Sequence, residues 1–202
     1  MDRTQAPSLS AITEIEFVAP KVRAINDRVN LYHMPHVPND TARFDLYFNA
    51  GKIRNQESLA SFVSGLLFSG TKDKTSVEIN SAINRLGGFL DTGLSAESAV
   101  ISMYCLKEHL PALFEILFDA ITNVSFREDE VSDFLKDRKQ KLQISREKVS
   151  YLAQSNFQVE LFASDERYMT ILQDEHFASV TQEGLKQFHE EFILKGLDRM
   201  IV

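Results

Sequence analysis

The amino-acid sequence predicts an α+β fold, a two-layer sandwich in which helices cover a mostly antiparallel sheet. Two observations support this prediction. Segments with apolar residues at every second position occur beside segments at helical spacing, and the two kinds do not alternate strictly. The chain has 202 residues, of which 44% are hydrophobic, so it can build a real core. We expect an extended lead-in over residues 1–19 and a single domain over residues 20–202.

The predicted strands follow from period-two alternation or β-rich composition, which cover residues 28–33, 43–49, 99–105 and 197–202. In the second of these segments, Phe44, Leu46 and Phe48 share one face. Turn-forming Pro, Asn and Asp residues separate the first two segments. We therefore expect these two segments to pair with each other as a hairpin.

Apolar residues at helical spacing predict helices over residues 59–67, 75–86, 110–121 and 181–193. A long charged segment predicts a further helix over residues 128–149, which continues as helix over residues 151–162. Thr75 and Glu78 have the spacing of a capping box at the start of the second helix, because the hydroxyl can accept a backbone N–H while the carboxylate reaches back. We expect this helix to end at Gly87. The residues that it should direct inward are Val77, Ala82, Ile83 and Leu86.

The composition argues against some classes of partner. The formal net charge is −7, whereas nucleic acids and anionic lipids favour clustered Lys and Arg. No apolar run approaches the roughly 18 residues of a membrane span, and the first residues lack the apolar stretch of a signal peptide. We expect no nucleic acid and no membrane insertion. The sequence does not fix the location, and we expect the bacterial periplasm or cell envelope if a leader was removed and the cytoplasm otherwise. Cys105, the only cysteine, should be buried in a strand.

Three stretches of the sequence carry a resemblance to a known family. Residues 48–52 read Phe-Asn-Ala-Gly-Lys, and residues 67–71 read Leu-Phe-Ser-Gly-Thr. This resembles the pitrilysin/insulinase family of zinc peptidases, which includes the mitochondrial processing peptidases. There, a strand ending in Ala-Gly leads to a helix with His-x-x-Glu-His and then Met-Leu-Phe-x-Gly-Thr. Residues 86–91, Leu-Gly-Gly-Phe-Leu-Asp, are similar to the family's Leu-Gly-Gly-x-x-Asn. The resemblance covers about residues 20–202 and implies the N-terminal half-domain of such a protein, with the C-terminal half absent from this chain.

The zinc motif of that family is degenerate in this sequence. The resemblance places Ser61 and Gly65 at the two His positions, Ser64 at the Glu position and Leu142 near the position of the third ligand. In the motif, two His at i and i+4 share one helix face and reach one zinc ion, while the Glu polarises the attacking water. Serine is a poor ligand, Gly65 has no side chain, and residues 138–146 contain no acid. We therefore expect no bound zinc and no catalytic residue at these four positions.

The resemblance implies a function without catalysis. Some members of the family pair a catalytic subunit with one that has lost the zinc motif, and the inactive subunit helps to enclose an unfolded peptide. We accordingly expect a heterodimer with a catalytic zinc-peptidase homologue, and an unfolded peptide as the bound substrate. The family also implies that peptide adds to the edge strand after Gly88 through backbone hydrogen bonds. The residues expected there are Asp91, Thr92, Gly93, Leu94 and Ser95.

Two other functions remain open from the sequence. The full-length protein can be an active metallopeptidase that uses residues outside this chain or a relocated site, or the domain can be a structural or assembly module. Three short segments that contain His, residues 33–36, 174–176 and 189–191, do not have metal-ligand spacing. We interpret the first as a turn and the other two as charged surface or helix faces.

Overall fold

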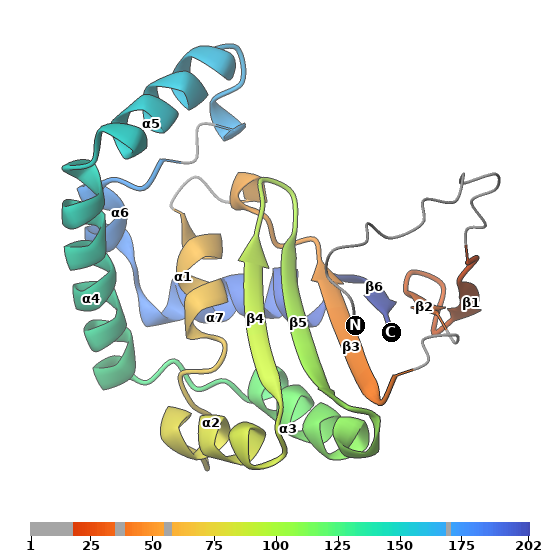
Figure 1. Ribbon diagram of the computed structural model, residues 1–202. Helices are drawn as coiled ribbons and strands as arrows, with labels where there is room; N and C mark the ends of the chain where they lie inside the picture. Colours follow the sequence, from red (N-terminus) through yellow and green to blue (C-terminus); the bar gives the residue numbers. More distant parts are fainter. Residues whose placement is uncertain (1–17, 35–38, 55–57, 169–170) are drawn as a thin grey trace, which may run out of the picture.

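The computed structural model describes residues 18–34, 39–54, 58–168 and 171–202. Most of the predicted lead-in therefore lies outside the described residues. The described chain forms an α+β structure in which helices pack against one open, six-stranded sheet (Figure 1). The predicted fold class is confirmed.

The strands of the sheet lie in the order β1-β2-β6-β3-β5-β4. Neighbouring strands are antiparallel except for β2 and β6, which are parallel. The bounds are β1 (Lys21–Ala24), β2 (Asn30–His33), β3 (Thr41–Phe48), β4 (Phe89–Leu94), β5 (Ala99–Leu106) and β6 (Leu197–Ile201). β1 and β4 are thus the two edges of the sheet.

The predicted hairpin between β2 and β3 is wrong. β6, from the end of the described chain, lies between the two strands and pairs with both of them, parallel to β2 and antiparallel to β3. Leu31 is opposite Met200, and Met200 is in turn opposite Leu46. Period-two alternation shows that a segment is a strand, but it does not say which strand pairs with it, and here a distant segment takes the central place.

Except for α6, which the sequence did not predict, the helices have bounds close to those predicted. They are α1 (Leu59–Leu66), α2 (Ser76–Arg85), α3 (Leu110–Thr122), α4 (Glu128–Arg146), α5 (Val149–Leu161), α6 (Asp174–Ser179) and α7 (Gln182–Phe188). α7 continues into η4 (His189–Leu194), a π-helical segment, and the short 3-10 segments are η1 (Lys52–Arg54), η2 (Lys107–His109) and η3 (Glu166–Tyr168). No helix among the described residues is long and apolar enough to cross a membrane.

The hydrophobic core lies between the sheet and the helices on one of its faces. Phe44 and Leu46 of β3 are opposite Met103 and Ile101 of β5, and all four side chains are buried. The helices α1, α2, α3 and α7 contribute most of the other residues of this cluster, and α4 and η4 add Val131 and Ile193. Cys105 is also buried there, as predicted, and its burial raises the pKa of the thiol.

The start of α2 is as predicted, but the set of residues that face the core differs from the prediction. The Thr75 hydroxyl accepts the backbone N–H of Glu78, and the Glu78 carboxylate accepts the backbone N–H of Thr75, so the capping box is present. The prediction that Val77 faces inward is wrong, because Val77 is 71% exposed. Ile79 and Ile83 are the buried residues, since they lie four apart on the face toward the core.

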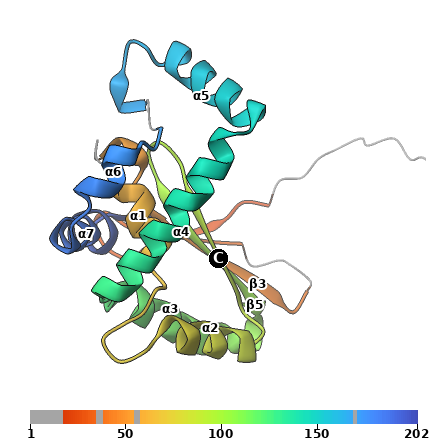
Figure 2. The same cartoon turned by 90° about the vertical axis from the view of Figure 1, so that its left-hand side faces the viewer.

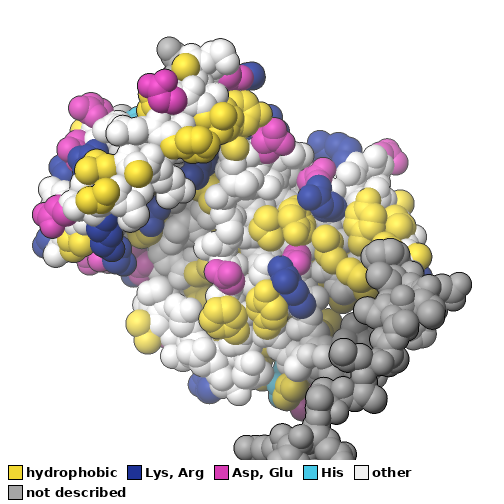
Figure 3. Space-filling model, turned by 45° about the horizontal axis from the view of Figure 1, so that its top comes forward, with side chains coloured by type: hydrophobic (Ala, Val, Ile, Leu, Met, Phe, Trp, Pro, Cys, Tyr) yellow, Lys and Arg dark blue, Asp and Glu magenta, His cyan; other side chains and the backbone are white. Residues whose placement is uncertain are grey.

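α4 and α5 form an arm at one end of the molecule. α4 packs against α1 and α6, and the following helix α5 projects away from the sheet (Figures 1 and 2). α4 ends at Arg146, slightly before the predicted end. α5 buries none of its residues, and Val149 and Phe157 are among its exposed apolar side chains. Hydrophobic side chains accordingly appear on the surface of this upper part in Figure 3.

Candidate functional site

The three positions that the resemblance assigns to the zinc motif lie on α1. Ser61 is half-buried, and Ser64 is buried in the protein at 9% exposure. Gly65 lies beside Phe134 of α4, and a Cβ atom added to Gly65 would be 2.5 Å from Cζ of Phe134. Packing of this helix against α4 therefore leaves no room for a side chain at position 65 unless the ring moves.

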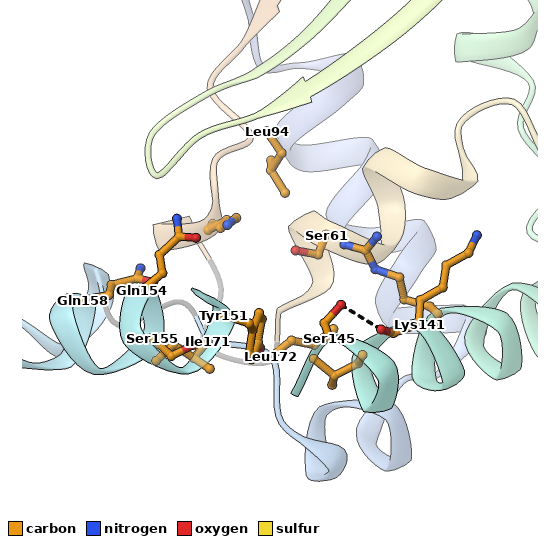
Figure 4. A pocket seen from close by; sticks show the side chains of 13 residues that line it. Ser61, Leu94, Lys141, Ser145, Tyr151, Gln154, Ser155, Gln158, Ile171 and Leu172 are labelled. Carbon is orange, nitrogen blue, oxygen red and sulfur yellow. Dashed lines mark hydrogen bonds between the residues drawn. The ribbon is translucent and has the colours of Figure 1, made fainter. Parts of the chain in front are cut away.

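A cavity opens where α1 meets α4, and both Ser61 and Leu142 line it (Figure 4). It has a volume of about 400 Å³, and its walls come from η1, α1, the end of β4, α4 and α5. The structure thus brings together two of the four degenerate positions, although one is on α1 and the other on α4. Leu142 is 7% exposed and gives the cavity part of its apolar wall.

Among the residues that the structure describes, the charged side chains that line this cavity are all cations. Lys52 and Arg138 line it, and within the described ranges no acid does. Neither side chain makes an ion pair or hydrogen bond there, whereas Lys141, at the same cavity, pairs with Asp137 at 2.6 Å. Loss of hydration, and then the nearby charge of Arg138, lower the pKa of Lys52. The cavity is therefore positive in a chain whose net charge is −7.

The residues around the cavity do not fit a zinc ion. Zinc in proteins takes Cys, His, Asp or Glu as ligands, whereas this cavity offers hydroxyls, amides and cations. In the parts of the chain that the structure describes, no three His, Cys, Asp or Glu residues group closely enough to hold a metal. Like charges at the cavity also disfavour a divalent cation. We therefore derive no reaction step through zinc.

The strand proposed for peptide contact is the free edge of the sheet. β4 pairs with β5, and no other described strand lies beside it. Asp91, Thr92 and Gly93 are exposed, and Leu94 is half-buried at the cavity. Backbone groups along one side of β4 are therefore available to an added strand.

Ser95 differs from the other four expected contact residues, because its backbone groups already have partners. Its N–H donates to the carbonyl oxygen of Ser98 at 2.9 Å, and its own carbonyl accepts the N–H of Lys52 at 3.1 Å. The Ser95 hydroxyl also accepts the N–H of Ser98 at 3.0 Å. The available edge therefore ends at Leu94, and Ser95 belongs to the turn that follows it.

His176 and His189, which we interpreted from the sequence as parts of charged surface or helix faces, differ from each other in the structure. His176 Nδ1 accepts the backbone N–H of Gln173 at 3.0 Å, within the cap of α6. The interpretation of His189 as part of a charged face is wrong, because it is 6% exposed and its Nε2 lies 2.7 Å from the carbonyl oxygen of Ile121. The continuation of α7 into η4 turns this ring toward the end of α3. His36 lies outside the described residues.

Sequence reasoning missed Lys52 and Arg138 as possible binding residues. Arg138 is one of several cations on the charged helix α4, and Lys52 follows the Ala-Gly turn after β3. Nothing in their local sequence indicates that they share a cavity. The one signal in the sequence that is relevant to a positive site is the absence of acids over residues 138–146, which also excludes a metal ligand there.

The fold and this site define a peptidase-like α+β domain without the side chains of a zinc motif. The profile of the family described as Insulinase (Peptidase family M16) matches residues 33–176. Because this match covers most of the chain, the chain belongs to the insulinase family. The resemblance inferred from the sequence is confirmed.

Comparisons with individual proteins agree with this assignment. The chain is 27% identical over 111 residues to a probable mitochondrial-processing peptidase subunit alpha-1 of Arabidopsis thaliana, and 27% identical over 104 residues to an uncharacterized zinc protease of Rickettsia bellii. These alignments cover 54% and 50% of this chain but only 22% and 25% of the relatives. The chain thus spans about a quarter of the length of these curated relatives.

Solved structures share the fold. A peptidase M16 inactive domain from Pseudomonas fluorescens superimposes with a TM-score of 0.81 at 15% identity, over 90% of this chain and 45% of that one. The periplasmic protease PqqL from Escherichia coli gives a TM-score of 0.80 at 16% identity, over 93% of this chain and 22% of that one. At these identities the likeness concerns the fold alone.

Proposed function

We propose that this chain is a non-catalytic, peptide-binding half-domain of an insulinase-family assembly. In this proposal it forms one wall of a peptide chamber together with a catalytic zinc-peptidase homologue. The proposal depends on two features that occur together at one end of the sheet. Ser61, Ser64, Gly65 and Leu142 supply no metal ligand, while the adjacent edge strand β4 is free to pair.

Two features support peptide as the ligand. An extended peptide can add to a sheet edge through its backbone, which tolerates varied sequences, and β4 offers such an edge from Phe89 to Leu94. One relative carries the name of a subunit of a processing peptidase, and one structural neighbour is described as an inactive domain. Both are consistent with a role beside a catalytic homologue.

Amide hydrogen exchange tests this proposal on the full chain assembled with its partner. Adding an unfolded peptide should slow exchange of the amides over residues 91–98, especially Asp91 to Leu94. The opposite edge strand β1 (Lys21–Ala24) is the control, because it is equally terminal in the sheet and should not respond. Protection elsewhere with residues 91–98 unchanged would contradict the proposed site.

A second candidate function is that of an assembly module without a bound peptide. The exposed apolar residues of α5, such as Phe157 at 65% exposure, favour it. The same exchange experiment separates the two functions. An assembly module would protect α5 when the partner binds but show no change at β4 when peptide is added. Chelator-sensitive hydrolysis by the chain would instead favour the third possibility, an active metallopeptidase.

A further inference from the structure

The cavity between α1, α4 and α5 combines positive charge with an apolar wall. We infer that this cavity binds a carboxylate group of the bound peptide, either its C-terminus or an acidic side chain. This inference rests on the proposed peptide-binding function and specifies the class of peptide that the site prefers. It concerns the position where the family's zinc site would lie, but its charged groups, Lys52 and Arg138, are outside the four motif positions.

The charges at the cavity favour an anion. Lys52 from η1 and Arg138 from α4 line the same cavity, and no described acid lies there to neutralise them. Both the loss of hydration at Lys52 and the like charge of Arg138 raise the free energy of the empty site, and in this order they lower the pKa of Lys52. A carboxylate between them would offset this repulsion and could accept hydrogen bonds from the guanidinium and the ammonium.

The neutral residues of the cavity fit the rest of such a ligand. Ser61, Tyr151 and Gln154 surround it with further hydrogen-bond donors, and they point toward a common space in Figure 4. Leu142 and Leu172 add apolar surface. A volume of about 400 Å³ is within the range of pockets for organic ligands. It is larger than a bare inorganic ion requires, so an anion attached to an apolar body fits better.

The position of the cavity connects it to the peptide edge. Leu94, the last residue of β4, lines the cavity, so a peptide added along β4 would reach the cavity from that end. A positively charged N-terminus would meet Lys52 and Arg138 there and be repelled. A peptide carboxylate is therefore the group that both the edge strand and the cavity can hold at once.

Three peptides of one length test the inference on the full chain with methyl-labelled Leu and Ile. They are acetyl-Ala-Ala-Ala-Ala-Leu with a free carboxylate, the same peptide as its amide, and the amide with Glu at the third position. The methyl signals of Leu94, Leu142 and Leu172 report on the cavity. We expect at least one carboxylate peptide to bind roughly tenfold more tightly than the uncharged amide, the ratio typical of a charge-assisted hydrogen bond. Which of the two binds more tightly identifies the source of the carboxylate.

Matched variants distinguish carboxylate binding at the cavity from a general effect of the protein's positive charges. The double variant Lys52→Gln with Arg138→Gln should lose the roughly tenfold preference for carboxylate and leave binding of the uncharged amide unchanged. Lys139→Gln is the control, because it removes one positive charge from the next position of α4 and does not line the cavity. This control should keep the preference.

The outcomes distinguish this inference from the proposed function. Equal binding of all three peptides, with β4 amides protected in each case, would overturn the carboxylate site and leave the proposed function standing. Cavity methyl shifts with the carboxylate peptides but no protection of β4 would sustain the carboxylate site and overturn the edge-strand function. No methyl shift with any peptide, or tighter binding of inorganic phosphate than of every peptide, would overturn the inference.

Discussion

Phe134 of α4 occupies the space beside Gly65 of α1, the position that the resemblance assigns to the second His of the zinc motif. A Cβ atom on Gly65 would lie 2.5 Å from Cζ and 2.7 Å from Cε2 of this ring. Both distances are far below normal contact between carbon atoms. The packing of α4 against α1 therefore depends on the absence of a side chain at position 65.

Gly65→Ala should destabilise the chain even though alanine favours helices. The added methyl group must displace the Phe134 ring, and overpacking of this kind costs about 1–3 kcal/mol. Gaining Ala for Gly in a helix returns only about 0.5–1 kcal/mol. We therefore expect a net loss of about 1 kcal/mol in the free energy of unfolding, measured by urea denaturation.

The Phe134→Ala background is the control for Gly65→Ala. With the ring removed, the same change should become neutral or stabilising, by up to about 1 kcal/mol, because only the helix propensity of position 65 remains. The same loss in both backgrounds would show that Phe134 does not oppose a side chain at position 65.

The unmodified chain should retain well below one equivalent of zinc after a chelator wash and reloading. Neither Ser61 nor Leu142 supplies a strong ligand, and the cavity that both line is positive. Elemental analysis of the dialysed protein measures this. One equivalent of zinc that is lost in the Ser61→Ala variant would refute the expectation, and so would chelator-sensitive hydrolysis of an unfolded peptide.

Restoring the motif alone should fail to restore zinc binding. The variant with Ser61→His, Ser64→Glu, Gly65→His and Leu142→Glu places four new side chains in a site that Phe134 partly fills and Arg138 charges. Adding Phe134→Ala and Arg138→Gln removes both obstacles. We expect zinc uptake to increase between these two variants, and equal uptake would show that the surroundings do not limit binding.

The capping box of α2 can be tested by one substitution. Thr75→Ala removes the hydroxyl that accepts the N–H of Glu78, and loss of such a cap typically costs about 1 kcal/mol. Thr75→Ser keeps the hydroxyl and serves as the control. Equal unfolding free energies for the Ala and Ser variants would show that the cap does not stabilise the fold.

Local patterns in the sequence predicted local structure well. Alternating residues identified β3 and β5, and the Thr75–Glu78 spacing identified the start of α2, because each of these signals lies within a few neighbouring residues. The pairing of β2 with β6 could not be predicted in this way. It depends on which distant strand fits between β2 and β3, and neither strand's own pattern contains that information.

The candidate site was likewise predictable only where its residues lie close together in the sequence. Ser61, Ser64 and Gly65 could be assigned to the zinc motif by resemblance because they have a fixed spacing on one helix. Lys52 and Arg138 could not be identified in this way, since they come from η1 and α4 and meet only after the chain has folded. The backbone partners of Ser95 are likewise set by the turn to Ser98 and by η1, which the alternation of residues does not describe.

The buried His189 should make the folding stability depend on pH. Its charged neighbours in the sequence do not indicate this burial. Burial lowers the pKa of this imidazole, although the carbonyl of Ile121 and the charge of Glu190 oppose the shift. For Nε2 to bond the Ile121 carbonyl oxygen at 2.7 Å, it must carry a proton and donate it. A neutral ring with its proton on Nε2 can make this hydrogen bond. A second proton would give the ring a positive charge in a buried position.

The direction of the pH effect follows from this lowered pKa. Below the ordinary His value of about 6.5, the unfolded chain takes up a proton at position 189 while the folded chain does not. The unfolded state then binds more protons, so folding stability falls as pH drops from about 6.5 toward the lower folded pKa, by at most about 1.4 kcal/mol per pH unit. Above about pH 7 this residue should contribute no slope.

Two substitutions at His189 separate the proton from the hydrogen bond. His189→Gln keeps an N–H donor for the Ile121 carbonyl oxygen but cannot titrate, so its stability should fall less than that of the unmodified chain between about pH 7 and pH 5. His189→Phe also removes the donor and should cost about 1–3 kcal/mol near pH 7, because the carbonyl is left unpaired, and its pH slope should be reduced like that of the Gln variant. Urea denaturation at each pH measures both effects. An identical pH slope in the Gln variant and the unmodified chain would show that His189 is not the titrating group.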